Sequence, residues 1–251
     1  MSILEFALDV VLGLVLGTLG GLFGIGGGLI AIPVLGVLFG LDQQLAQGTA
    51  LVMVVPNVLL AVWRYHQRNR IDIRHAGALA ISSFAFAIVG AAVAVSLDAS
   101  RMRMAFVVFL LALAAYTLLR AFLRHQSGGT ELRYPWPWLG LLGAGAGSLG
   151  GLFGVGGAVL ATPILTAVFG TSQVVAQGLS LALAAPSTGV TLAAYAMHGQ
   201  VDWWLGLPLA LGGLLSISLG VRLAHALPER LLRVLFSGFL VASAVLLAYK
   251  G

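Results

Sequence analysis

The chain has 251 residues, of which 60% are hydrophobic and only 8% are charged, and its mean hydropathy is +1.04. So little polar surface cannot cover a globule in water, which excludes a soluble domain and requires lipid as the solvent. The net charge of +5 would suggest nucleic-acid binding in a soluble protein, but most basic residues stand in short connectors between apolar runs. The absence of cysteine excludes disulfides, thiolate metal sites and a cysteine nucleophile.

Apolar stretches follow one another along the whole chain and predict an all-helical integral membrane protein. A helix needs about 20 residues to cross about 30 Å of hydrocarbon. Two stretches are too short for this, and each follows a glycine cluster, so we expect the helices to break there inside the membrane. The helices are expected at residues 3–23, 29–39, 44–63, 76–97, 102–122, 137–153, 159–169, 174–197, 204–226 and 231–249.

The sequence contains an internal repeat that aligns without a gap. Gly20 aligns with Gly150, an offset of 130 residues, which places GGLFGIGGGLIAIPVL over GGLFGVGGAVLATPIL. The same offset aligns AQG at 46–48 with AQG at 176–178. A register that holds this long indicates a tandem duplication. We therefore predict a first membrane repeat at 1–125, a polar connector at 126–133 and a second membrane repeat at 134–251.

Charge differs between equivalent connectors of the two repeats. In the first repeat the connector after the third stretch holds Arg64, Arg68, Arg70 and Arg74, whereas its counterpart HGQVDWW has no Lys or Arg. Cytoplasmic loops are enriched in Lys and Arg, so the same loop is expected on opposite sides of the membrane in the two repeats. This predicts two repeats of inverted topology, with about five helical segments each and both chain ends outside. Many secondary transporters have this architecture, with substrate near the midplane.

The glycine clusters GIGGG and GVGGA are the strongest candidates for a binding site. Each opens a short helix whose free backbone N–H groups and dipole favour an anion. The upstream GxxxGxxxG ladders, Gly13, Gly17 and Gly21 with Gly143, Gly147 and Gly151, are expected to pack helices instead. The breaks are expected at Gly24, Gly28 and Gly154, and the substrate contacts at Gly26, Gly27, Gly156 and Gly157.

Prolines and polar residues add further candidates within the apolar stretches. Prolines free a carbonyl and kink a helix, which can line a cavity, although plain helix shaping is the alternative for each. Glutamine amides can donate to an anion, but they can also link helices. Serine and threonine can donate too, although they often bond to their own backbone. The prolines are Pro33, Pro56, Pro163 and Pro186, and the polar candidates are Gln47, Gln177, Asn57, Ser187 and Thr188.

Other kinds of site are disfavoured by the sequence. All five histidines fall at segment ends or in loops without a carboxylate at ligand spacing, so neither a metal nor another cofactor is expected. No charged residue stands convincingly in mid-membrane, which argues against a carboxylate proton relay or a fixed sodium site. An intramembrane serine hydrolase would use Ser148 or Ser180, but no GxSxG motif or histidine accompanies them. A catalytic site is therefore not expected, whereas a passive anion channel stays an alternative to a carrier.

The duplicated glycine-proline signature, together with AQG and the following mid-segment proline, resembles the sulfite exporter TauE/SafE family of membrane permeases. The resemblance covers nearly the whole chain. It implies a multi-pass protein of the bacterial or archaeal cytoplasmic membrane that exports small sulfur-containing anions such as sulfite, thiosulfate or organosulfonates. One departure is Ala158, which stands where the first repeat has Gly28.

Residue pattern and resemblance together predict one mechanism. An anion is held near the midplane by N–H groups at the breaks and by the amides of Gln47 and Gln177, and alternating access follows from rocking one repeat against the other. The expected partners are thus the anion and the lipid bilayer, without nucleic acid, and the sequence is compatible with a homodimer.

Overall fold

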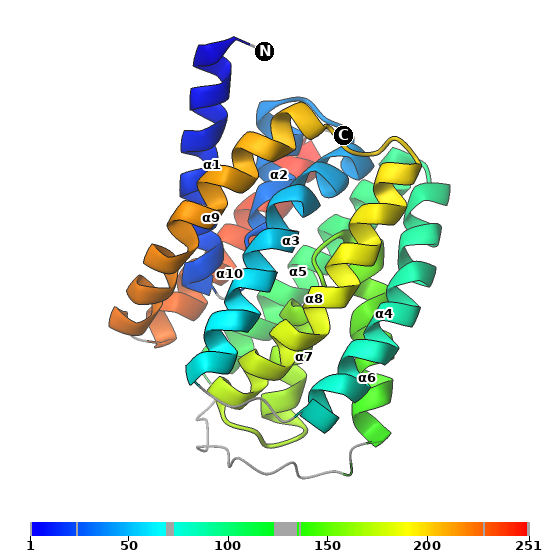
Figure 1. Ribbon diagram of the computed structural model, residues 1–251, viewed down its shortest axis with the longest axis vertical. Coiled ribbons are helices and arrows are strands. Elements are labelled where there is room, and N and C mark those ends of the chain that lie inside the picture. Colours follow the sequence, from blue (N-terminus) through cyan, green and yellow to red (C-terminus); the bar gives the residue numbers. More distant parts are fainter. Residues whose placement is uncertain are drawn as a thin grey trace. The chain divides into compact units, whose positions relative to one another are not determined.

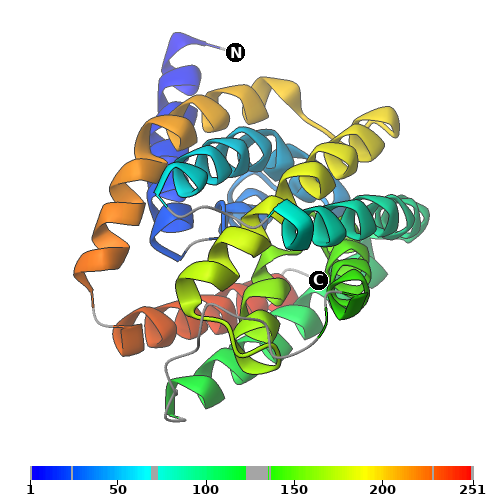
Figure 2. The ribbon, with the colours of Figure 1, turned by 60° about the horizontal axis from the view of Figure 1, so that its bottom comes forward.

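The computed structural model describes residues 2–23, 25–68, 73–122, 135, 137–227 and 229–249. Their regular structure is helical, as predicted, and Figures 1 and 2 show the arrangement of the helices. The helices are α1 (Ile3–Phe23), α2 (Gly28–Leu38), α3 (Gln43–Arg68), α4 (Ile73–Ser96), α5 (Ala99–Phe122), α6 (Pro137–Phe153), α7 (Ala158–Ala167), α8 (Gln173–Met197), α9 (Trp203–Ala226) and α10 (Glu229–Tyr249).

Every predicted stretch is a helix, with its ends within a few residues of the prediction. The largest difference is at the end of α3, which runs five residues beyond Trp63 to Arg68. In the described part of the chain, six helices are long and apolar enough to cross a membrane. Their outward faces carry large apolar side chains such as Ile81 and Leu215, each 74% exposed. The protein is therefore a multi-pass membrane protein.

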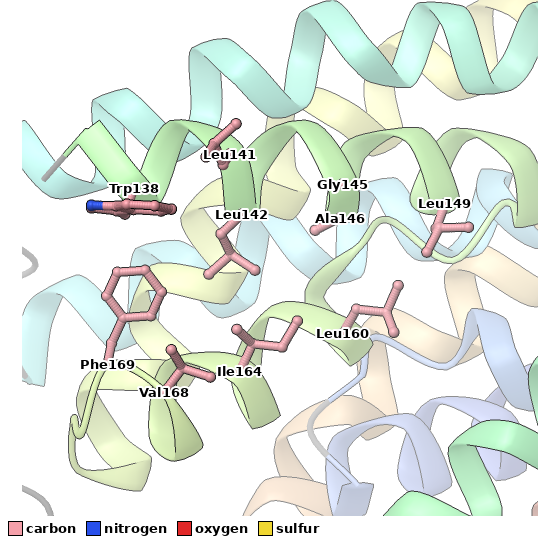
Figure 3. Close-up of a pocket in the computed structure, with 10 residues that line it drawn as sticks. All are labelled: Trp138, Leu141, Leu142, Gly145, Ala146, Leu149, Leu160, Ile164, Val168 and Phe169. Atoms are coloured by element: carbon pink, nitrogen blue, oxygen red, sulfur yellow. The ribbon is translucent and has the colours of Figure 1, made fainter. Parts of the chain in front are cut away.

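The predicted breaks are confirmed at both glycine clusters. α1 ends at Phe23 and α2 begins at Gly28, while α6 ends at Phe153 and α7 begins at Ala158. Figure 3 shows α7 running back alongside α6, so that these two helices form a hairpin with the glycine cluster at its tip. At 11 and 10 residues, α2 and α7 are about 15 Å long, half of the hydrocarbon thickness.

The chain divides into two compact units. The first consists of Met1–Met53, Leu97–Gln126 and Gln200–Gly251, and the second of Val54–Ser96 and Ser127–Gly199. The first unit thus holds α1, α2, the start of α3, α5, α9 and α10, and the second holds the rest of α3, α4, α6, α7 and α8. Each unit takes helices from both sequence repeats. The predicted division into repeats stays a prediction, and its connector at 126–133 lies outside the described residues.

The same helix pairing occurs once in each unit. In the first unit α1 packs along α9, and in the second unit α6 packs along α4, as Figures 1 and 2 both show. Since α6 is the counterpart of α1 and α9 the counterpart of α4, the first helix of each repeat lies on the fourth helix of the other. The first unit also contains the pairs α10 with α5 and α10 with α2.

The GxxxGxxxG ladders make these close contacts, which confirms their predicted packing role. A Cβ added at Gly17 would lie 2.5 Å from the Cα of Gly213 on α9, and one at Gly147 would lie 2.7 Å from the Cα of Ser83 on α4. The other ladder glycines, Gly13, Gly21, Gly143 and Gly151, likewise face backbone atoms of the partner helix. Backbones approach this closely only where neither side chain intervenes.

Candidate functional site

The tip of the first hairpin, between α1 and α2, lies in the first unit, and its described residues are buried. Gly26 and Gly27 have φ angles of 71° and 94°, in the left-handed region that glycine adopts without steric cost. Gly27 is the N-cap of α2, and Gly24 lies outside the described residues. The chain therefore reverses direction here through two successive glycines.

The tip of the second hairpin repeats this geometry in the second unit. Gly154, Gly156 and Gly157 have φ angles of 67°, 73° and 73°, and Gly157 is the N-cap of α7. Ala158 replaces Gly28 without backbone strain, because neither residue has a positive φ. The replacement of glycine by alanine at this position thus leaves the turn unchanged.

Equivalent residues hold both tips against a long helix. A Cβ added at Gly27 would lie 2.9 Å from Cε of Met53 on α3, and one at Gly157 would lie 3.1 Å from Cδ2 of Leu183 on α8. Met53 and Leu183 are related by the repeat offset of 130 residues. Each is about ten residues into its helix, so the tips lie about 15 Å from the helix start, at a depth near the middle of the bilayer.

The first backbone N–H groups of α2 and α7 are the donors that each helix start presents at its tip. The first hydrogen bonds into α7 run from the N–H groups of Leu160 and Ala161 to the carbonyl oxygen of Gly157, at 3.1 and 3.0 Å. The N–H groups of Ala158 and Val159 therefore have no acceptor within the helix, and no side chain caps it. Together with the helix dipole, such an end favours negative charge. α2 starts in the same way, with Ile30 and Ala31 bonding to Gly27.

The hydroxyls of Ser187 and Thr188, both fully buried, lie next to the second tip. The Ser187 hydroxyl is 3.2 Å from the carbonyl oxygen of Gly156 and 3.1 Å from that of Leu183. Thr188 Oγ1 donates to the carbonyl oxygen of Ala184 at 2.8 Å, and its Cγ2 occupies the space beside Gly156. Each hydroxyl has one hydrogen, and here it serves a carbonyl. Ser187 thus ties the tip to α8, whereas Thr188 packs against it.

The glutamines lie at a different depth from the glycines. Gln47 is fully buried on α3 and Gln177 is half-buried on α8. Each stands six residues before the residue that contacts the tip, about 9 Å along the helix axis. Asn57, also fully buried on α3, belongs to the second unit, whereas Gln47 belongs to the first. Within each unit, the glutamine side chain and the backbone of the glycine tip therefore offer polar groups at two different depths along the helix.

The predicted prolines all lie inside helices. Pro33 and Pro163 stand within α2 and α7, and α3 and α8 continue through Pro56 and Pro186. The breaks in the chain are thus made by the glycines, while each proline removes one hydrogen bond from a continuous helix.

Two residues outside the predicted site help to hold it. The Tyr195 hydroxyl donates to the carbonyl oxygen of Leu152 at 3.0 Å, which satisfies a carbonyl in the last turn of α6. Gly48 of the AQG motif lets the carbonyl oxygen of Gln200 approach α3, and next to it the N–H of Asp202 donates to Thr49 Oγ1 at 3.0 Å. Two features of the sequence could have pointed to these residues: the repeat offset aligns Tyr65 with Tyr195, and the AQG motif that contains Gly48 occurs in both repeats.

Among the described residues, no group of three or more His, Asp and Glu side chains could hold a metal ion. From residue 137 to residue 197 the sequence contains no charged side chain at all, and from residue 10 to residue 63 it contains only Asp42. An anion at the hairpins would therefore meet backbone dipoles and neutral side chains.

A sequence profile described as sulfite exporter TauE/SafE matches residues 10–247, nearly the whole chain. The chain belongs to the sulfite exporter TauE/SafE family. The probable membrane transporter protein YunE of Bacillus subtilis is 24% identical over 99% of both chains. A probable membrane transporter protein of Methanocaldococcus jannaschii is 27% identical over 95% of this chain and 93% of its own. One from Xylella fastidiosa is 28% identical over 95% and 91%.

Membership in the TauE/SafE family assigns the chain to a family of membrane transporters. The relatives come from bacteria and an archaeon, and this chain matches them over nearly their full lengths. The profile also covers both glycine tips and the helices that hold them.

Proposed function

We propose that this protein is a secondary transporter that exports small sulfur-containing anions, such as sulfite, thiosulfate or organosulfonates. The observation that carries the proposal is the pair of buried, uncapped helix starts at the glycine tips, in a chain of the TauE/SafE family. Backbone N–H groups at helix starts suit anions with several oxygen acceptors. The relatives are described as probable membrane transporters, which supports the proposal that the protein has no enzymatic activity.

The composition of the hairpins supports release as well as binding. A buried lysine or arginine would hold an anion through a strong charge-assisted pair, and none is present between residues 137 and 197. Partial charges at helix ends act over about one turn and fall off quickly. The tips would therefore bind an anion weakly enough for turnover. The glutamines would offer a second set of polar contacts, at a different depth, to an anion that moves to or from the tips.

Alternating access between two inverted repeats is the mechanism we propose. Each repeat contributes one hairpin and three further long helices, and an odd number of crossings would begin the second repeat on the opposite side of the membrane. Because each compact unit combines helices of both repeats, the moving bodies in this proposal are the two units, and their motion would expose the tips to each side in turn. A passive channel is the alternative. Anion flux through a channel would not saturate with anion concentration and would not be accelerated by anion on the opposite side, as flux through a carrier is.

Flux measurements on purified protein in liposomes test this proposal. Thiosulfate, sulfite, sulfoacetate and sulfate are offered as radiolabelled anions, with and without a pH gradient. We expect saturable uptake of at least one sulfur oxyanion or organosulfonate, accelerated by unlabelled anion on the opposite side. Ohmic conductance without saturation would show that the protein is a channel and not a carrier. The absence of flux for all of these anions would contradict the proposed substrate class.

The glutamines offer a second test of the site. A side-chain amide that donates to an anion contributes about 1.5–3 kcal/mol, so Gln47→Ala and Gln177→Ala should each weaken anion binding about tenfold to a hundredfold. Anion affinity and unfolding temperature are measured on the same samples. Unchanged affinity together with a lower unfolding temperature would instead assign both glutamines to helix packing.

A further inference from the structure

An apolar groove of about 600 Å³ lies between α6 and α7 in the second unit. Figure 3 shows Trp138 and Phe169 at one end of the groove and Leu149 and Leu160 at the other. Apart from the indole N–H of Trp138 at one end, the side chains that line the groove carry no hydrogen-bonding group, so its interior offers no partners to water. The lining residues are Trp138, Leu141, Leu142, Gly145, Ala146, Leu149, Leu160, Ile164, Val168 and Phe169.

Two small residues on α6 create the space. A Cβ added at Gly145 would meet no atom within 4 Å, and next to it Ala146 forms part of the buried floor. At the equivalent positions the first repeat has the larger side chains Val15 and Leu16. The small residues that line the groove are thus specific to the second repeat, and they are not the ladder glycines that pack on α4.

The counterpart of α7 in the first unit has a partner on its surface. α10 packs on α2, with Cδ2 of Leu247 3.4 Å from a Cβ added at Gly36. On α7, Leu160 is half-buried, whereas its counterpart on α2, Ile30, is fully buried. Farther along α7, Ile164 is half-buried and Val168 just beyond the helix is 47% exposed. The hairpin therefore has an open apolar side at membrane depth.

The length of the groove matches a single leaflet of the bilayer. From Trp138 to Leu149 it follows α6 for eleven residues, about 17 Å, which is close to half of the roughly 30 Å of hydrocarbon. Trp138 stands in the first turn of α6 and is 56% exposed. Tryptophan is enriched where hydrocarbon meets the headgroups. The groove thus runs from the interface toward the midplane, as an acyl chain does.

We propose that the groove binds one acyl chain of a phospholipid from the leaflet in which α6 begins, with Trp138 at the level of its ester groups. The acyl chain of the lipid fills the space beside Gly145 and packs against the open side of α7. Because α7 starts at the second glycine tip, a bound lipid stabilises that tip. This lipid site is independent of the identity of the transported anion.

Filling the groove by mutation tests the proposal on the full-length protein in mild detergent. Gly145→Leu occupies the space, and Gly140→Leu is the matched control, since Gly140 on the same helix also has open space but does not line the groove. Both changes gain helix propensity equally. Native mass spectrometry counts the phosphatidylethanolamine and phosphatidylglycerol molecules retained, and thermal unfolding is followed with and without added phosphatidylglycerol.

We expect wild type and Gly140→Leu to retain a phospholipid and to unfold at a higher temperature when lipid is added, as mass action requires. Gly145→Leu should lose that lipid and respond less to its addition. Equal retention and equal response in all three proteins would overturn the proposal. Disulfide-linked dimers of Leu141→Cys formed in membranes would also overturn it, because they would assign the groove to a second copy of the chain.

Discussion

At the scale of single residues, Gly156 shows why the tip requires glycine. Its φ of 73° is strained for any residue with a Cβ, at a cost of about 1–2 kcal/mol. The space beside it is already filled by Cγ2 of Thr188. Backbone conformation and packing thus both exclude a side chain at Gly156. The two effects can be measured separately, because replacing Thr188 by a smaller residue relieves the packing but not the backbone strain.

We expect Gly156→Ala to destabilise the protein by about 2–5 kcal/mol, since overpacking adds about 1–3 kcal/mol to the backbone strain. Adding Thr188→Ser removes the clashing methyl group while keeping the hydroxyl, so it should recover the packing part only. Unfolding free energies of both variants and of Thr188→Ser alone give the coupling. Identical stability of Gly156→Ala with and without Thr188→Ser would show that the methyl group does not matter.

At the scale of elements, the glycine-rich helix α6 has faces with different functions. Gly143, Gly147 and Gly151 lie against α4, whereas Gly145 opens the groove toward α7. Their spacing on one helix distinguishes them, because residues four apart share a face and residues two apart do not. The Tyr195 hydrogen bond then fixes the end of α6 to α8.

Valine at a ladder position should force α6 and α4 apart. A Cβ at Gly147 would lie 2.7 Å from the Cα and 2.9 Å from the carbonyl carbon of Ser83, and backbone atoms cannot rotate away. We expect Gly147→Val to cost at least about 1–3 kcal/mol of stability. Gly140→Val meets open space and serves as the control for helix propensity. Similar unfolding temperatures in detergent for the two variants would contradict close packing at Gly147.

At the scale of the whole molecule, an exchange of helices between the repeats builds both compact units. α1 packs along α9 and α6 along α4, so neither repeat could bury its first helix by itself. We expect from this that separately expressed repeats are unstable, since each would expose a ladder of glycines to lipid.

Inverted topology makes a specific prediction at this scale. Gln67 and Met197 are equivalent positions near the ends of α3 and α8, and both are exposed. Single cysteines there, in a chain without native cysteine, should react with an impermeant thiol reagent from opposite sides of the membrane. A soluble reporter fused to the N-terminus fixes which side is which. Labelling of both cysteines from the same side would refute the inversion.

Much of the fold could be predicted from the sequence because the lipid bilayer allows a membrane-spanning segment few backbone conformations. Apolar stretches separated by polar connectors must be helices in hydrocarbon, and the repeat offset locates equivalent residues in both halves. The clusters GIGGG and GVGGA determined where the chain breaks, since only glycine adopts several positive φ angles in succession. The substrate candidates in these clusters were found from the same local signal.

Only the tertiary structure decided which helices share a unit and which groups face each other. Sequence periodicity places Gly147 and Gly145 on different faces of α6 but does not say that one meets α4 and the other an open groove. It also could not show that the hydroxyl of Ser187 bonds to Gly156, or that Met53 and Leu183 are the residues that contact the tips. The physical reason is that van der Waals contact and hydrogen bonds between distant segments depend on packing in three dimensions, whereas lipid solvation acts on each segment alone.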